Sequence, residues 1–134
     1  MGADKNLAVV QEIYGAFGRG DVETILSHVA DDVDWASEPD SPAAAPWHGR
    51  RDRAQVPAFF AAIAEAVEVT EFTPLSFATN DTDVMVVIRF GMTIRATGRA
   101  GEMDLHHWWR FRDGQVVLYR GTEDTALTAA LLAP

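Results

Sequence analysis

The chain has 134 residues, of which 48% are hydrophobic and 23% charged, a composition typical of one globular domain with a single core. Its net charge of −9 argues against nucleic acid and anionic membrane surfaces as partners, and the absence of cysteine excludes disulfides and thiol chemistry. No apolar run reaches the roughly 18 residues of a membrane helix, and the first residues lack a signal-peptide pattern, so we expect a cytoplasmic protein.

The N-terminal part of the sequence has helical periodicity. Residues 6–17 place apolar side chains on one helical face, and the glycines on either side of Arg19 end this helix. Asp21 is a suitable N-cap for a short second helix over residues 22–29.

The next segment changes character twice. Residues 31–35 alternate like a short strand, whereas residues 36–47 contain three prolines and predict an irregular loop. A loop of this length is often a lid or a rim of a site. The pattern of residues 52–66 predicts a third helix with Pro57 in its first turns. Its buried stripe is formed by Val56, Phe59, Phe60 and Ile63.

Two long strands are predicted next. Residues 67–79 form a strand in which Pro74 implies an edge position or a bulge. Residues 84–97 form the second strand, and a turn is expected at residues 100–101. One face of the second strand carries Val86, Ile88, Phe90 and Met92.

Residues 103–123 predict a hairpin around a turn at residues 113–114. A two-residue loop would pair Phe111 with Val116, and a three-residue loop with a bulge would pair Phe111 with Gln115. This one-residue slip moves the second strand's side chains to the other face. In the bulged register one face holds Leu105, His107, Trp109, Phe111, Val117, Tyr119, Gly121 and Glu123, and in the plain register Leu118 and Arg120 join His107 instead.

Asp124 is expected to cap a last helix over residues 125–132. Three helices followed by a run of antiparallel strands predict one α+β domain over residues 1–134, with helices on one face of a curved sheet.

This pattern resembles the nuclear transport factor 2-like superfamily, and within it the SnoaL-like and ketosteroid isomerase-related proteins. The resemblance covers nearly the whole chain and implies a cone-shaped domain. Three N-terminal helices would pack on a strongly curved, mixed, mainly antiparallel sheet and enclose an apolar pocket. It also favours the bulged hairpin register. The segments that carry the resemblance are residues 16–21, 30–35, 48–50, 96–99, 111–116 and 123–126.

Ketosteroid isomerases use an aspartate base at the end of the first strand, with a tyrosine of helix one and a sheet aspartic acid as donors to the enolate. A gap-free alignment puts Ser37, Ile13 and His107 at these positions, so the isomerase set is not intact. Glu38 and Tyr14 stand one residue away from the base and the donor.

Limonene epoxide hydrolases also resemble this chain, but their Asp-Arg-Asp set falls on Phe90, Ile88 and Gly121. Epoxide opening by that mechanism is therefore not expected. The SnoaL-like cyclases need mainly one acid/base group and a shaped apolar cavity, and they remain compatible with the sequence.

Four residues are the candidates for catalysis. His107 would be desolvated and neutral among aromatic side chains, and could act as an acid/base near pH 7 or be a satisfied core histidine. Tyr119 could donate to a developing oxyanion or be pocket wall. Glu123 could orient His107, act as an acid, or lie at the rim beside an arginine. Glu38 could be a carbon-acid base or a solvated loop carboxylate.

The remaining site residues are expected to contact the ligand. His106 and His107 are adjacent on a strand and point to opposite faces, so they cannot chelate one metal, and no cofactor motif is present. We expect neither metal nor cofactor. The predicted ligand contacts are Tyr14, Trp35, Ser37, Trp47, Phe59, Ile88, Phe90, Met92 and Trp109.

The sequence thus predicts a cofactor-free isomerase, cyclase or dehydratase of a hydrophobic carbonyl compound. The alternative is a module of the same fold that binds a small ligand or serves in assembly, without catalysis. A homodimer is expected through the outer sheet face, with Trp108 and Leu118 near its centre, because exposed apolar side chains there disfavour a monomer.

Overall fold

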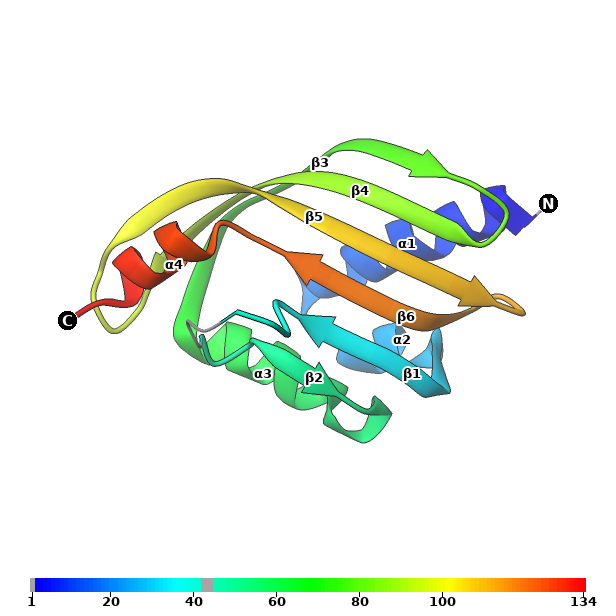
Figure 1. The fold of residues 1–134 in the computed structure, drawn as a ribbon, viewed down its shortest axis with the longest axis horizontal. Helices are drawn as coiled ribbons and strands as arrows, with labels where there is room; N and C mark the ends of the chain where they lie inside the picture. Colours follow the sequence, from blue (N-terminus) through cyan, green and yellow to red (C-terminus); the bar gives the residue numbers. More distant parts are fainter. Residues whose placement is uncertain (1, 42–44) are drawn as a thin grey trace.

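The computed structural model describes residues 2–41 and 45–134 as an α+β domain (Figure 1). Residues 42–44 of the predicted loop lie outside this range. The described elements are α1 (Gly2–Arg19), α2 (Val22–Ser27), β1 (Val29–Ser37), β2 (Gly49–Arg51), a 3-10 turn η1 (Arg53–Gln55), α3 (Val56–Ala66), β3 (Val67–Thr79), β4 (Asp83–Ile94), β5 (Ala100–Arg112), β6 (Gln115–Thr122) and α4 (Thr125–Leu132).

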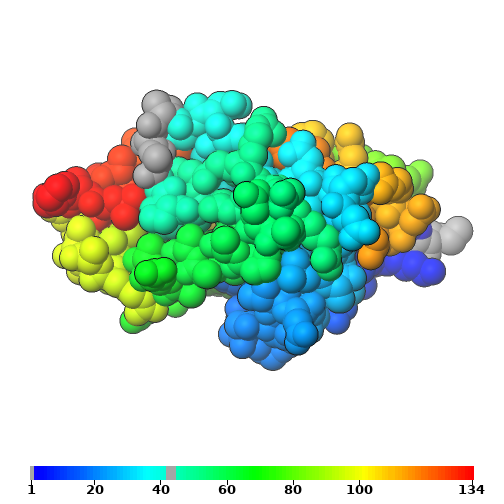
Figure 2. All heavy atoms as spheres, turned by 90° about the horizontal axis from the view of Figure 1, so that it is seen from below, coloured from blue at the N-terminus to red at the C-terminus, as the bar shows by residue number. Residues whose placement is uncertain are grey.

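Over the described residues, six strands form one curved, mixed sheet in the order β2-β1-β6-β5-β4-β3. Neighbouring strands are antiparallel except β1 and β6, which run parallel. In Figure 1 the long strands arch over α1 and α3, and α4 follows β6 at the C-terminal end. Figure 2 views the side from which the helices cover the sheet. No helix of the described segments is long and apolar enough to cross a membrane.

Side-chain caps mark where α2 and α4 begin, as predicted. The Asp21 side chain accepts from the backbone N–H of Thr24 at 3.1 Å, and the Asp124 side chain accepts from that of Leu127 at 3.0 Å. Asp52 forms a capping box with Gln55, but it caps η1, and α3 begins only at Val56. The third predicted helix is thus shorter than expected, and in the chain it follows β1, β2 and η1.

Strand β3 has the predicted bounds and the predicted edge position. Pro74 lies beside a shift in the β3–β4 register, where its missing N–H removes no hydrogen bond from a central strand. The predicted inner face of β4 is confirmed, because Val86, Ile88, Phe90 and Met92 are all buried.

The predicted turn at residues 100–101 is wrong. Both residues lie in β5, and the chain reverses between Ile94 and Arg99, with Gly98 in the left-handed region at φ 73°. Gly101 is needed for close packing, since a Cβ there would stand 3.0 Å from a methyl carbon of Leu131 in α4. In a sequence, a glycine that makes room within a strand for a neighbouring helix looks the same as a glycine that forms a turn.

Neither predicted hairpin register holds along the whole hairpin. Asp113 and Gly114 form the two-residue turn, with φ of 51° and 78°, and Phe111 pairs with Val116. One residue later a bulge shifts the register. Beyond the bulge Trp109 pairs with Tyr119 and His107 with Gly121, so these side chains share a face as the bulged register implied. Val116 is buried and Val117 only half-buried, contrary to that register.

Candidate active site

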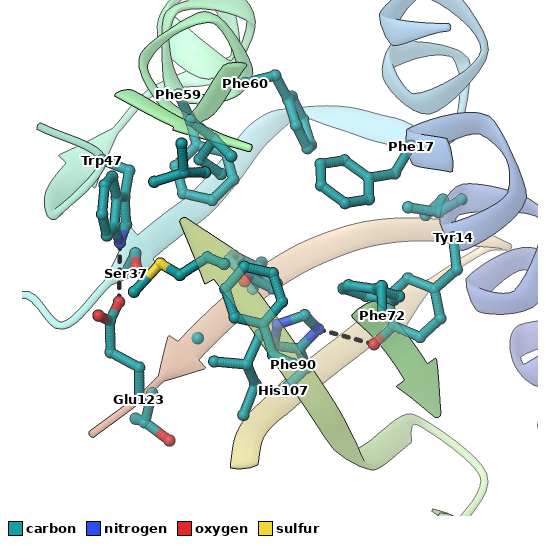
Figure 3. A pocket seen from close by; sticks show the side chains of 18 of the residues that line it. Tyr14, Phe17, Ser37, Trp47, Phe59, Phe60, Phe72, Phe90, His107 and Glu123 are labelled. Atoms are coloured by element: carbon teal, nitrogen blue, oxygen red, sulfur yellow. Dashed lines mark hydrogen bonds between the residues drawn. The ribbon is translucent and has the colours of Figure 1, made fainter. Parts of the chain in front are cut away.

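A cavity of about 90 Å³ lies between the sheet and the helices, and its lining is almost entirely apolar and aromatic. Side chains of α1, α3, β1 and the four strands β3 to β6 contribute to it (Figure 3). Among the described residues that line this cavity, Glu123 is the one charged side chain. The other polar groups of the lining belong to Tyr14, Trp35, Ser37, Trp47, His107, Trp109, Tyr119 and Thr122.

His107 is joined to helix α1 by a hydrogen bond. The Tyr14 hydroxyl oxygen lies 2.7 Å from His107 Nδ1, and the indole N–H of Trp109 donates to the same hydroxyl at 3.1 Å (Figure 3 shows the Tyr14–His107 bond). Burial lowers the pKa of His107 to about 3, with a smaller effect of neighbouring His106. His107 is therefore neutral at physiological pH. Burial also raises the pKa of Tyr14.

Tyr119 stands beside His107 on the inner face of the hairpin. Their ring centroids are 5.2 Å apart, and the Tyr119 hydroxyl lies over Gly121, which pairs with His107. Burial raises the pKa of Tyr119 well above 10, with further contributions from Tyr14 and Glu123, so its hydroxyl keeps its proton. The nearby charge of Glu123 thus favours the neutral phenol.

Glu123 is held by three donors, two of which lie far from it in the sequence. Trp47 Nε1 donates to it at 2.8 Å, His48 Nε2 lies at 3.0 Å, and the Thr128 hydroxyl donates at 2.5 Å (Figure 3 shows the bond from Trp47). Burial raises the pKa of Glu123, but hydrogen bonds from His48, Thr128 and Trp47 outweigh burial and hold the pKa below its usual range. Glu123 is ionised at neutral pH.

His48 presents its Nε2–H to this carboxylate. The backbone N–H of Ala45 donates to His48 Nδ1 at 3.1 Å, so Nδ1 carries no proton. Nε2 is therefore the ring nitrogen that donates to Glu123. His48 also orders the end of the loop through its contact with Ala45. We expected Glu123 to orient His107, but Glu123 contacts His48. His107 is oriented by its contact with Tyr14.

Glu38 lies beside the cavity without being part of its lining. Its carboxylate accepts from the backbone N–H of Glu123 at 2.6 Å, and its own backbone has φ of 42°. This contact ties the chain after β1 to the residue that follows β6, and it occupies one carboxylate oxygen. Glu38 is thus placed to support Glu123.

Most of the predicted ligand contacts line the cavity. They are Tyr14, Trp35, Ser37, Trp47, Phe59, Phe90, Met92 and Trp109. Ile88 does not belong to the lining; it is fully buried in the core. Sequence reasoning missed three cavity phenylalanines, Phe17, Phe60 and Phe72. Phe17 and Phe60 stood in predicted helical stripes, which could have marked them as facing the sheet. No group of three or more potential ligand side chains in the described segments is placed to hold a metal ion.

The arched sheet and the helices that cover it define a nuclear transport factor 2-like domain. A solved NTF2-like protein of unknown function from Burkholderia pseudomallei has the same fold, with a TM-score of 0.87 and 27% identity over 97% of this chain and 98% of that chain. A family model, the SnoaL-like domain, matches residues 10–119, and the chain belongs to this family.

Two further solved structures share the fold at lower identity. TerC, crystallised with polyporic acid, has a TM-score of 0.84 and 23% identity, over 97% of this chain and 99% of that chain. IdmH of Streptomyces antibioticus, a candidate polyketide cyclase, has a TM-score of 0.76 and 22% identity, over 96% of this chain and 99% of that chain. Among curated proteins, none matches this sequence significantly.

Proposed function

We propose that this protein is a cofactor-free enzyme that transfers a proton next to the carbonyl group of a hydrophobic small molecule, in an isomerase, cyclase or dehydratase reaction. Membership of the SnoaL-like family supports small-molecule chemistry of this kind. The observation that carries the proposal is the arrangement of His107, Tyr119 and Glu123 around one apolar cavity.

The substrate oxygen would bind at the His107–Tyr119 end. Tyr119 is a neutral donor, and its hydroxyl lies over Gly121 next to His107. A donor in a water-poor site stabilises negative charge that develops on a carbonyl oxygen much better than the same donor does in water. Enolate formation is the step that such a donor favours.

The proton acceptor would be Glu123. It is ionised, lines the same cavity as Tyr119 and His107, and its charge helps to raise the pKa of Tyr119. Its three donors hold it in place and limit its basicity. Glu38 would assist by holding the backbone of Glu123. Aromatic side chains such as Trp35, Phe59 and Phe90 would bind the hydrophobic part of the substrate.

Deuterium exchange tests this proposal without the natural substrate. Hydrophobic ketones incubated with the protein in D2O should incorporate deuterium beside the carbonyl. Glu123→Gln should slow exchange by about 100- to 10,000-fold, the usual contribution of a placed proton acceptor. Glu65→Gln, at an exposed position of α3, is the matched control. If ketones bind and none exchanges, the protein is a non-catalytic binding module.

We also propose that the protein is a homodimer through the outer face of the sheet. Met85 is 47% exposed there and pairs with half-buried Trp108, and Leu118 lies on the same face. A second copy would cover these apolar side chains. Sedimentation at micromolar concentration should give a dimer, and Met85→Glu should weaken it. A monomeric wild type would refute the dimer.

A further inference from the structure

The chemistry open to His107 depends on which ring nitrogen carries the proton. A neutral imidazole with a bare Nε2 can remove a proton, whereas one with a proton on Nε2 can donate a hydrogen bond. Nδ1 of His107 is occupied by the Tyr14 hydroxyl at 2.7 Å. The direction of that hydrogen bond therefore decides the role of Nε2.

Trp109 decides this direction. An indole N–H can only donate, so the Tyr14 oxygen is the acceptor in the 3.1 Å contact with Trp109. The hydroxyl hydrogen of Tyr14 must then point to another acceptor, and in the described part of the chain His107 Nδ1 is the acceptor in reach. The reverse direction would leave the Tyr14 hydroxyl hydrogen without an acceptor among the described residues, which is unfavourable.

The other ring nitrogen remains available to a ligand. Nε2 of His107 has no hydrogen-bond partner among the described residues. Among the described residues, Trp35 Nε1 is the fully buried side-chain polar atom that lacks a hydrogen-bond partner. His107 Nε2 also lacks a partner but is not fully buried, so it keeps some accessible surface. His107 lines the cavity, and in Figure 3 Tyr14 reaches it from the side of the cavity away from Glu123.

We propose that Trp109 and Tyr14 are positioning residues that fix His107 as the Nε2–H tautomer, so that His107 donates a hydrogen bond to the substrate oxygen and does not act as the base. The two contacts form a chain from the Trp109 N–H to the Tyr14 oxygen, and from the Tyr14 O–H to His107 Nδ1. The donor role rests on the proposed function, whereas the tautomer is a property of the protein alone.

This assignment changes the roles within the site. His107 and Tyr119 become a pair of neutral donors for one oxygen, and Glu123 is left as the proton acceptor. Tyr14 is not a donor to the ligand, although it stands one residue from the position of the isomerase tyrosine, because its hydrogen is used by His107. The site thus obtains its oxyanion donor from a histidine held neutral by burial.

Nitrogen-15 NMR of the histidine-labelled protein tests the tautomer directly. Two-bond correlations between ring protons and nitrogens distinguish a proton on Nε2 from one on Nδ1. His107 should show the Nε2–H pattern and keep it down to about pH 5. His106, its exposed neighbour on the same strand, is the internal reference. A proton on Nδ1 of His107 in the wild type would overturn the proposal.

Paired tryptophan variants test the relay. Trp109→Phe frees the Tyr14 oxygen to accept from Nδ1, so the second tautomer should appear in the spectrum. Trp108→Phe is the matched control, because its indole N–H donates to Asp83 at 3.2 Å on the opposite face of the strand. Identical His107 spectra in the two variants would refute the role of Trp109.

Tyr14→Phe provides a second route if Trp109→Phe fails to fold. It removes the donor to Nδ1, and His107 should then populate both tautomers, whereas Tyr119→Phe should leave the Nε2–H pattern in place. An unchanged pattern in Tyr14→Phe would refute the relay. Failure of ketone exchange with a confirmed Nε2–H tautomer would refute the proposed function alone.

Discussion

The hydroxyl of Tyr119 occupies the space that a side chain at position 121 would need, and Gly121 leaves that space open. Gly121 pairs with His107, so the missing side chain lets Tyr119 stand next to the histidine inside the cavity. The proposed oxygen site therefore depends on a residue that contributes no functional group.

The first prediction concerns this space. Gly121→Ala should displace the Tyr119 ring, which is 4% exposed and surrounded by aromatic side chains, and should lower the free energy of unfolding by roughly 1–3 kcal/mol. Gly18→Ala is the control, since nothing lies within 4 Å of its Cβ position in α1; it should stabilise by up to about 1 kcal/mol. Urea unfolding measures both, and equal stabilities would contradict the packing argument.

The second prediction links stability to pH through His107. Its pKa is about 3 in the folded protein because of burial, and about 6.5 in an unfolded chain. Below pH 6.5 the unfolded chain binds a proton that the folded protein does not. This contribution to stability is therefore complete above pH 6.5, and it is lost as pH falls toward 3, by about 1.4 kcal/mol per pH unit.

Urea midpoints between pH 7 and pH 4 measure this effect. His107→Gln should show a shallower loss of stability than the wild type across that range. His106→Gln, at the exposed neighbouring position, should keep the wild-type slope. Parallel curves for His107→Gln and the wild type would show that His107 binds its proton equally well in both states.

The third prediction concerns ligand charge. Glu123 is ionised and is the one charged side chain among the described lining residues, with Glu38 bonded to its backbone. Acetophenone should therefore bind at least about tenfold more tightly than benzoate, a difference of about 1.4 kcal/mol. Quenching of tryptophan fluorescence measures both affinities.

Glu123→Gln should narrow this difference by improving benzoate binding, because a buried like charge is removed. Glu65→Gln on the exposed side of α3 should leave the ratio unchanged. Tighter benzoate binding in the wild type would mean that a cation compensates Glu123 when the ligand is bound.

Local sequence patterns predicted several elements well. The bounds of β3 and α4, the caps at Asp21 and Asp124, and the edge position of Pro74 all follow from short-range chemistry. They depend on neighbours within about four positions, which a sequence shows directly. Gly101 was misread because its reason for being glycine is Leu131, which lies thirty positions away in the chain.

By itself the sequence determined the succession of helices and strands apart from β2, together with the apolar inner faces and the presence of His107 in an aromatic wall, since periodicity and composition encode these properties. Only the tertiary structure decided which groups meet. Tyr14 and His107 are 93 positions apart, and Trp47 and Glu123 are 76 apart. The physical reason is that bulges and the packing of helices on the sheet set these contacts. A single bulge after Val116 determines which side chains of β6 face the cavity.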